Sequence, residues 1–141
     1  MTDADDPSTD ENVDTFGGHA TITAYMSDEI VVLDPDTTLR QAAIALEEAG
    51  VGCVVVGSPD HVEGVVSERD ILRAVAERID LDATPVRDIE SRHLMWATTD
   101  STVDEVVDEM MGNYVRHVLV GEDRRLVGIV SIRDVLAAYA G

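Results

Sequence analysis

Two hydrophobic patterns divide this chain into short strands and amphipathic helices. Residues 51–56 are apolar throughout, which is typical of a strand buried on both faces. Residues 39–46 carry apolar side chains at the spacing of one helical face, and Gly50 follows as a helix stop. The predicted elements of the first half are a lead-in helix at 19–27, a strand at 30–33, a helix beginning at 39, strands at 51–56 and 62–66, and a helix beginning at 67.

The second half repeats this order at a fixed offset of 64 residues. Between residues 36–72 and 100–136, 12 of 37 positions are identical without a gap, which indicates two equivalent half-units. Each half therefore reads β-α-β-β-α. We expect an α/β (α+β) fold of two small mixed sheets flanked by helices, with the halves related by a pseudo-twofold axis. The predicted elements of the second half are a lead-in turn at 86–89, a strand at 94–97, a helix beginning at 103, strands at 115–120 and 126–130, and a helix at 131–139.

Composition changes along the chain suggest its domain boundaries. Residues 1–18 hold six acidic residues, little apolar content and a double glycine, and they are predicted to be a disordered acidic tail. The first repeat then occupies 19–80, a linker 81–85 and the second repeat 86–141. On the helix that begins at residue 67, the predicted buried side chains are Ile71, Leu72, Val75 and Ile79.

The charge of the chain is strongly negative. The formal net charge is −19, from 29 acidic and 10 basic residues, and every basic residue is Arg. One reading of the missing Lys is a codon bias that replaces Lys with Arg. Together with the acidity it predicts a cytoplasmic protein of a halophilic archaeon, because molar salt screens self-repulsion. The same charge argues against nucleic acid or an anionic membrane as a partner.

Few residues offer chemistry outside the repeat. Cys53 is the only cysteine, so it forms no internal disulfide and is expected to be a small buried residue. The histidines show no pair with metal-ligand spacing, so no metal site is predicted. No hydrolase, nucleotide-loop or metalloprotease motif occurs, so we expect no catalytic residues and no enzyme activity. No signal peptide or membrane span is predicted.

One motif stands out because the chain contains it twice. Gly64-Val-Val-Ser-Glu-Arg-Asp70 recurs as Gly128-Ile-Val-Ser-Ile-Arg-Asp134. A strand that enters a helix through a serine presents unpaired N–H groups that attract anions. The aspartate three residues later can accept hydrogen bonds from a diol such as a ribose. The alternative reading is a helix-capping motif, which is compatible with ligand binding at the same tip.

The repeated Gly-apolar-apolar-Ser-x-x-Asp signature resembles that of the cystathionine β-synthase (CBS) domain. The phrase Tyr114-Val-Arg-His-Val-Leu-Val120, followed by residues 126–134, is especially similar to the family. The resemblance covers residues 22–140, and two copies in register resemble the tandem pair called a Bateman module. It implies a non-catalytic regulatory module, without a required cofactor, that binds AMP, ADP, ATP or S-adenosylmethionine in clefts between the two repeats.

The resemblance also implies roles for particular residues. Asp70 and Asp134 would take the ribose hydroxyls, and Ser67 and Ser131 would contact phosphate. Arg69 and Arg133 are near enough in sequence to assist. The remaining ligand-binding residues implied for the cleft of Asp70 are Leu94, Met95, Trp96, Arg116 and His117. Those implied for the cleft of Asp134 are the segment from Tyr25 to Val31, including Ile30 and Val31, together with Gly52 and Cys53.

The two implied clefts differ in charge. Arg116 and His117 favour a polyphosphate in the first, whereas the second is expected to take a nucleoside, a monophosphate or S-adenosylmethionine, or to stay empty. Trp96 is either an adenine-stacking residue or a core or interface aromatic, and His117 is alternatively a buried, hydrogen-bonded residue. The resemblance implies a homodimer that signals to a protein effector in trans. The alternative function is a ligand-free dimerisation or partner-docking module.

Overall fold

The computed structural model describes residues 17–140 of the chain. Residues 1–16 of the predicted acidic tail lie outside the described residues, and Gly17 and Gly18 begin a 3-10 turn, η1 (Gly17–His19). The contacts divide the chain into two compact units. Unit 1 takes in the chain up to Asp28, Met95–Asp123 and the chain from Val127 on, and unit 2 takes in Glu29–Leu94 and Arg124–Leu126.

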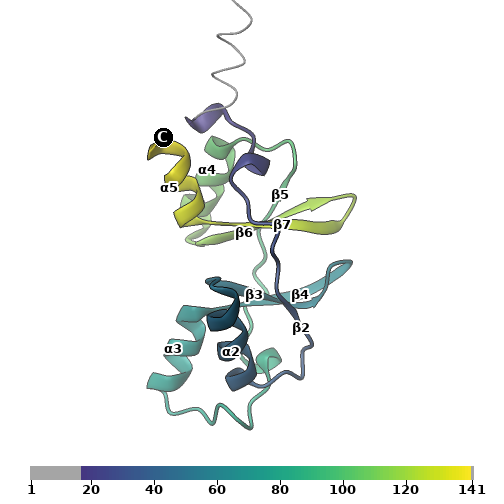
Figure 1. Ribbon diagram of the computed structural model, residues 1–141, viewed down its shortest axis with the longest axis vertical. Helices are drawn as coiled ribbons and strands as arrows, with labels where there is room; N and C mark the ends of the chain where they lie inside the picture. The colour runs from purple at the N-terminus through teal and green to yellow at the C-terminus, as the bar shows by residue number, and fades with distance from the viewer. Residues whose placement is uncertain (1–16, 141) are drawn as a thin grey trace, which may run out of the picture. The chain divides into compact units, whose positions relative to one another are not determined.

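Unit 2 consists of one three-stranded sheet and its helices. The elements are β2 (Val32–Leu33), α2 (Leu39–Ala49), β3 (Cys53–Ser58), β4 (His61–Ser67), α3 (Glu68–Ala76) and the 3-10 turn η3 (Val86–Asp88). The strand order is β2-β3-β4, with β2 parallel and β4 antiparallel to β3. Helices α2 and α3 lie side by side against this sheet (Figure 1).

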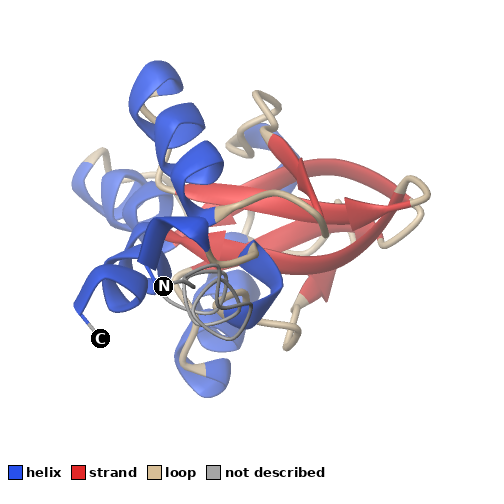
Figure 2. Cartoon of the chain, turned by 90° about the horizontal axis from the view of Figure 1, so that it is seen from above, coloured by secondary structure: helices blue, strands red, loops and turns tan. Residues whose placement is uncertain are grey.

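Unit 1 repeats this plan with the second set of elements. They are η1, η2 (Ile22–Ala24), β5 (Trp96–Thr98), α4 (Val103–Asn113), β6 (His117–Glu122), β7 (Arg125–Ser131, of which Arg125 and Leu126 belong to unit 2) and α5 (Ile132–Ala140). The strand order is β5-β6-β7, with β5 parallel to β6. In each unit the strands form one layer and the α-helices another (Figure 2). The predicted β-α-β-β-α order and α+β fold are confirmed.

Local sequence signals fix the helix ends. Thr38 and Gln41 form a reciprocal capping box at the start of α2, and Gly50 ends that helix in the left-handed conformation with φ +66°. Thr102 and Glu105 form the matching capping box of α4. Apolar faces of the capped helices then pack on the sheets. The fully buried side chains of unit 2 include Leu39, Ala42, Val54, Val56, Val66 and Val86, and those of unit 1 include Ile22, Val103, Val106, Val118, Val120 and Val130.

The exposed face of α3 differs from the prediction. Ile71 and Ala74, which are three residues apart and share one helical face, are buried. Leu72 is 68% exposed and Val75 is 52% exposed. The nine-residue helix presents only one narrow stripe to the core. Leu72 and Val75 each lie one position beyond a residue of that stripe, which rotates them about 100° away from it.

The lead-in segments also differ from the prediction, and they complete the two sheets. Residues 19–27 form a short 3-10 turn and not one helix, because the N–H groups of Tyr25 and Met26 both return to Ile22. Ser27 then bridges Ile129 in unit 1, and Ser91 bridges Val65 in unit 2. The outer edge of β7 is therefore bridged by the segment that precedes the first repeat, and that of β4 by the segment that precedes the second.

No helix among residues 17–140 has the length and apolar content needed to cross a bilayer.

Candidate ligand-binding site

Ser67 and Asp70 form a closed set of hydrogen bonds at the tip of α3. Ser67 Oγ accepts from the Asp70 N–H at 3.2 Å, and Asp70 Oδ2 accepts from the Ser67 N–H at 2.8 Å. The Ser67 hydroxyl also donates to Asp70 Oδ2 at 3.0 Å. Helix capping, the alternative reading of this motif, is therefore confirmed as one role of both residues.

The first turn of α3 retains fewer free donors than the sequence suggested. The Glu68 N–H donates to the carbonyl of Gly52 at 2.9 Å, and the Asp70 N–H is taken by Ser67. Two donors of this first turn are therefore already used within the unit.

Asp70 lies beside a small pocket, and its second carboxylate oxygen lies near Arg73. Oδ1 lies 3.6 Å from Arg73 Nη1, and the side chain of Asp70 is 22% exposed. The pocket next to it has a volume of about 50 Å³. That volume suits one or two water-sized groups, so a sugar hydroxyl fits it but a whole nucleoside extends beyond it. The lining residues are Asp70, Arg73, Ala74, Glu77, Ile79 and Ile89.

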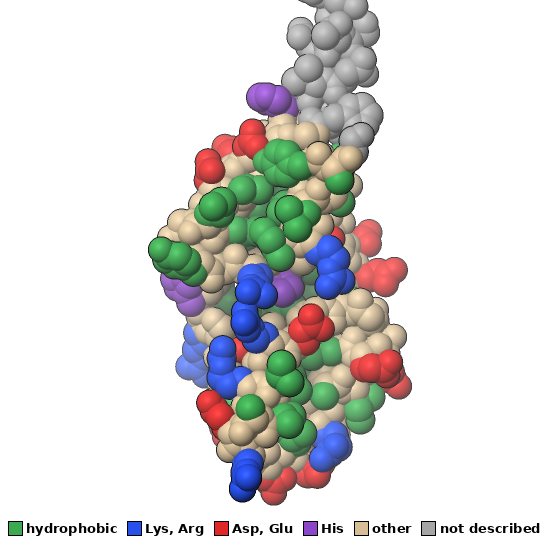
Figure 3. Space-filling view, turned by 90° about the vertical axis from the view of Figure 1, so that its left-hand side faces the viewer, with side chains coloured by type: hydrophobic (Ala, Val, Ile, Leu, Met, Phe, Trp, Pro, Cys, Tyr) green, Lys and Arg blue, Asp and Glu red, His purple; other side chains and the backbone are tan. Residues whose placement is uncertain are grey.

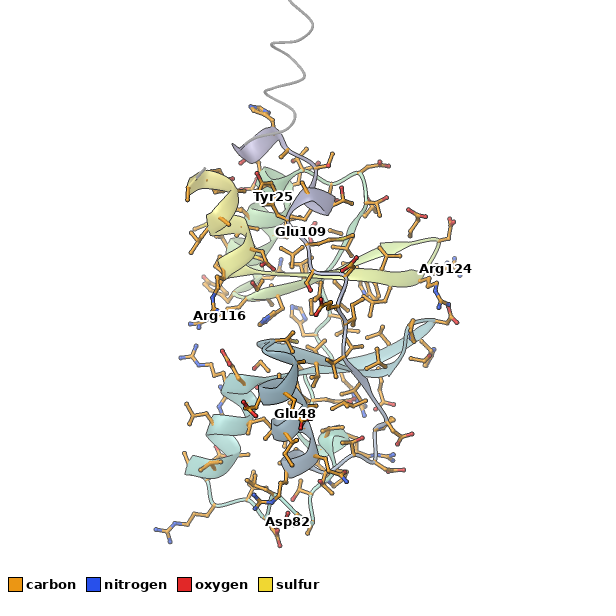
Figure 4. The ribbon with its side chains drawn as sticks, viewed as in Figure 1. Tyr25, Glu48, Asp82, Glu109, Arg116 and Arg124 are labelled. Atoms are coloured by element: carbon orange, nitrogen blue, oxygen red, sulfur yellow. The ribbon has the colours of Figure 1, made fainter. Side chains whose placement is uncertain are left out.

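The tip of α5 reproduces the geometry of α3. The Ser131 N–H donates to Asp134 Oδ2 at 2.8 Å, and the Asp134 N–H donates to Ser131 Oγ at 3.2 Å. The Ile132 N–H donates to the carbonyl of Arg116 at 2.9 Å, which holds the backbone of Arg116 at the start of α5. The side chain of Arg116 extends from this end of the unit (Figure 4). The predicted repeat of the site motif is thus also a repeat in three dimensions.

The residues predicted to bind ligand divide between the two units. The members in unit 2 are Ile30, Val31, Cys53, Ser67, Arg69 and Asp70. The members in unit 1 are Met95, Trp96, Arg116, His117, Ser131, Arg133 and Asp134. The structure brings Ser67 and Asp70 together in one unit, and Ser131 and Asp134 together in the other. The implied pairing of Asp70 with Arg116 and His117, and that of Asp134 with Cys53, stay predictions.

Cys53 carries a buried thiol and lies beside Ser67 in the sheet of unit 2. Its Cα pairs with that of Ser67 across β3 and β4, and the residue is 6% exposed. Burial, followed by the charge of Asp70, raises the pKa of the thiol to about 12. Cys53 therefore stays protonated at neutral pH, so it serves as a packing residue and not as a nucleophile.

The other predicted contact residues differ in exposure. Trp96 is 39% exposed on β5, opposite Leu119, so its indole is not part of the buried core. Val31 packs against the core of unit 2, and its carbonyl accepts from the Val55 N–H at 2.9 Å. Arg69, Arg116 and Arg133 are exposed.

Sequence reasoning missed the segment that borders the Asp70 pocket. Val65 and Ser91 exchange two backbone hydrogen bonds, of 3.0 and 2.8 Å, so this segment runs along the end of β4. Ile89 lines the pocket, and the neighbouring Glu90 side chain is 0% exposed. The 64-residue offset pairs Glu90 with Met26, and a charged residue in register with an apolar one was the signal that could have identified it.

Metal-binding clusters were also sought. Residues 17–140 contain no group of three or more His, Cys, Asp or Glu side chains placed to hold an ion. The chemistry offered by the two tips is therefore that of hydrogen bonding: carboxylate acceptors and nearby guanidinium groups.

Each of the two repeats carries a Ser-x-x-Asp motif at the start of a helix. The family profile described as "CBS domain" matches residues 22–77 and 86–141. This chain belongs to the CBS domain family and contains two copies of the domain.

Known relatives agree with this assignment. An uncharacterized 17.7 kDa protein of Acidianus ambivalens is 35% identical over 112 residues, which are 78% of this chain and 67% of that protein. The crystal structure of an uncharacterized conserved protein from Pyrococcus horikoshii has a TM-score of 0.78 at 30% identity, over 86% of this chain and 93% of that chain.

A further solved structure is that of a complex with a ligand. It is a CBS domain protein from Pyrobaculum aerophilum complexed with AMP, with a TM-score of 0.75 and 32% identity, over 86% of this chain and 98% of that chain. This chain spans less than two thirds of several curated relatives, and only 23% of one of them. The activities of those longer proteins are therefore not carried over to it.

Proposed function

We propose that this protein is a non-catalytic regulatory module that binds an adenosine-containing ligand at the tips of α3 and α5. AMP, ADP, ATP and S-adenosylmethionine are the candidate ligands. Ligand binding would favour one arrangement of the module and so change what a protein effector meets in trans. We further propose that the module works in the cytoplasm of a halophile, where salt screens its charge of −19.

The carboxylate of Asp70 carries the proposal. Its Oδ2 is fixed by the Ser67 cap, which orients the side chain, and its Oδ1 lies 3.6 Å from Arg73 Nη1. Asp70 lines the pocket. An oriented carboxylate whose oxygens have further lone pairs is a suitable acceptor for a ribose hydroxyl. The relative from Pyrobaculum aerophilum supports AMP as the first ligand to test.

The test is a thermal-shift titration in molar KCl with AMP, ADP, ATP and S-adenosylmethionine in turn. At a free concentration about 100 times the dissociation constant, a ligand that binds only the folded state adds about 2.7 kcal/mol to the free energy of unfolding. We expect a saturable rise in Tm for at least one ligand. It should be absent in the Asp70→Ala or the Asp134→Ala variant, and the affected variant identifies the tip that is occupied.

Thr38→Ala is the matched control for the Asp70 variant. Thr38 caps α2 in the same unit, so its loss removes a capping box of the same kind without touching the α3 tip. Both variants should lose about 1 kcal/mol of stability. Only Asp70→Ala should lose the ligand response. If both variants keep the response, or both lose it, Asp70 does not bind the ligand.

A second property is proposed from the exposed apolar side chains of the helices. Leu72 on α3 of unit 2 is 68% exposed, and Leu136 on α5 of unit 1 is 61% exposed. The space-filling view shows that hydrophobic side chains reach the surface (Figure 3). Exposed patches of this kind are typical of protein interfaces. We therefore propose that the chain forms a homodimer through its helices.

Light scattering after size-exclusion chromatography tests the dimer. The wild type should have twice the mass of the chain, and the double variant Leu72→Gln, Leu136→Gln should have the mass of one chain. Glu48→Gln, on the exposed surface of α2, is the control and should remain a dimer. A monomeric wild type at all concentrations would contradict the proposal.

A further inference from the structure

One position breaks the symmetry between the two repeats. A Cβ atom added to Gly128 would lie 2.3 Å from Met26 Sδ, so the Met26 side chain covers this glycine in unit 1. A Cβ atom added to Gly64 would lie 2.8 Å from Cδ and 2.9 Å from Cγ of Glu90, so Glu90 covers the equivalent glycine in unit 2. The same place holds a thioether in one unit and a carboxylate in the other.

The Glu90 carboxylate is buried and only half paired. Its side chain is 0% exposed, and Oε2 accepts from Arg92 Nε at 2.9 Å. Oε1 is buried and has no hydrogen-bond partner among residues 17–140. Burial raises the pKa of Glu90, the hydrogen bond from Arg92 opposes this effect, and Glu63 adds to it. A buried carboxylate oxygen without a donor is costly, which points to a donor that is bound only at times.

The location of Glu90 connects it with the Asp70 pocket. Ser91 is held against Val65 on β4 by two backbone hydrogen bonds, and β4 ends at Ser67, the cap of α3. Ile89, on the other side of Glu90, lines the pocket beside Asp70. The unpartnered oxygen thus belongs to the segment that borders the proposed ribose site, in the same unit.

We propose that Glu90 is a specificity-determining residue that accepts a hydrogen bond from the amino group of a 6-aminopurine bound at the α3 tip. This inference rests on the proposed function and extends it from a ribose site to a base-reading site. A carboxylate accepts but does not donate, so it pairs with the amino group of adenine and repels the 6-carbonyl group of hypoxanthine. Met26 in the equivalent place cannot make this distinction, so base selectivity is confined to unit 2.

Calorimetric titration with two matched ligands tests the proposal. AMP carries the 6-amino group, and purine riboside 5′-monophosphate lacks it. The wild type should bind AMP more tightly than the analogue by a factor of about 10 or more, because a charged acceptor left without its donor rejects the analogue. The Glu90→Met variant should bind the two ligands within about twofold of each other. It should fold, because Met occupies the equivalent position over Gly128.

Glu63→Ala is the control variant, because it removes the neighbouring carboxylate, brings no new hydrogen-bond donor and leaves Glu90 in place. It should keep the preference for AMP. A wild type without preference, or a Glu90→Met variant that keeps it, would overturn this inference and leave the proposed function intact. Loss of the preference in Glu63→Ala, with Glu90 unchanged, would overturn it in favour of a proton shared by the two carboxylates. A folded wild type that binds neither ligand would overturn the proposed function itself.

Discussion

Replacing Glu90 with Met should make the protein more stable, although it removes the hydrogen bond between Glu90 and Arg92. The Glu90 carboxylate lies over Gly64 with its side chain fully buried and Oε1 without a donor. An unsatisfied buried polar group costs about 1–3 kcal/mol. The hydrogen bond to Arg92, an exposed side chain, offsets little of this cost. Met fills similar space over Gly128 in the other unit, so no cavity is expected.

We therefore expect Glu90→Met to raise the free energy of unfolding by about 1–3 kcal/mol at pH 7. For a chain of this length, that gain corresponds to a rise in Tm of roughly 3–9 °C. Urea unfolding followed by circular dichroism measures the free energy, and a thermal scan measures Tm. Glu63→Ala is the comparison, because it removes a nearby charge without giving the orphaned oxygen a donor.

The gain should also depend on pH. Burial raises the pKa of Glu90 in the folded state above its ordinary value of 4.5, so the folded state binds the extra proton first. The penalty from Glu90 is absent below the unfolded pKa, grows as pH rises through the raised folded pKa, and is complete above it. The advantage of Glu90→Met over the wild type should therefore be largest at neutral pH and should shrink as pH falls toward 4.5. A destabilised variant, or a gain that does not change with pH, would refute the reasoning.

Three further variants test other parts of the structure. Gly64→Ala should lower the stability by about 1–3 kcal/mol in urea unfolding, because its Cβ would meet Glu90 and a backbone oxygen at under 3.0 Å. Gly112→Ala, on α4 with nothing within 4 Å, should be neutral or gain up to about 1 kcal/mol, and an equal loss at both positions would contradict the packing argument. Thr102→Ala should cost about 1 kcal/mol through its capping box, and no loss would mean that the cap does not form in solution. Because its pKa is about 12, Cys53 should resist a thiol reagent at pH 8 in the folded protein and react in urea, and rapid labelling of folded protein would contradict its burial.

The sequence predicted most of the fold because the repeat and the helix caps are local signals. Gly50 ends α2, and the apolar run of β3 is buried, as expected. The exposure of Leu72 was not predicted, because periodicity alone does not say how wide a stripe a nine-residue helix buries. A pattern of apolar residues indicates which side chains are shielded from water in the functional protein. It does not say whether the core of the same chain or a partner molecule covers them.

The sequence predicted the central pair of the candidate site but not the segment that lies beside it. The Ser67 and Asp70 pair follows from spacing within one motif, and the structure places both at one tip. Glu90 was missed because it belongs to a different segment, which the bridge between Ser91 and Val65 holds against β4. The internal repeat held a clue to it, since Met26 and Glu90 occupy equivalent positions. Comparing the two halves for their differences, as well as their identities, would have pointed to this carboxylate.

Calorimetric titration of AMP into the wild-type chain in molar KCl determines whether the protein binds an adenosine ligand. We expect saturable binding that is lost in Asp70→Ala, Asp134→Ala or both, and retained in the capping control Thr38→Ala. If folded protein gives no heat with AMP, ADP, ATP or S-adenosylmethionine, and no change in Tm with any of them, the chain is not an adenosine sensor. The exposed helix faces would then be the functional surface, and the docking function would replace ligand binding.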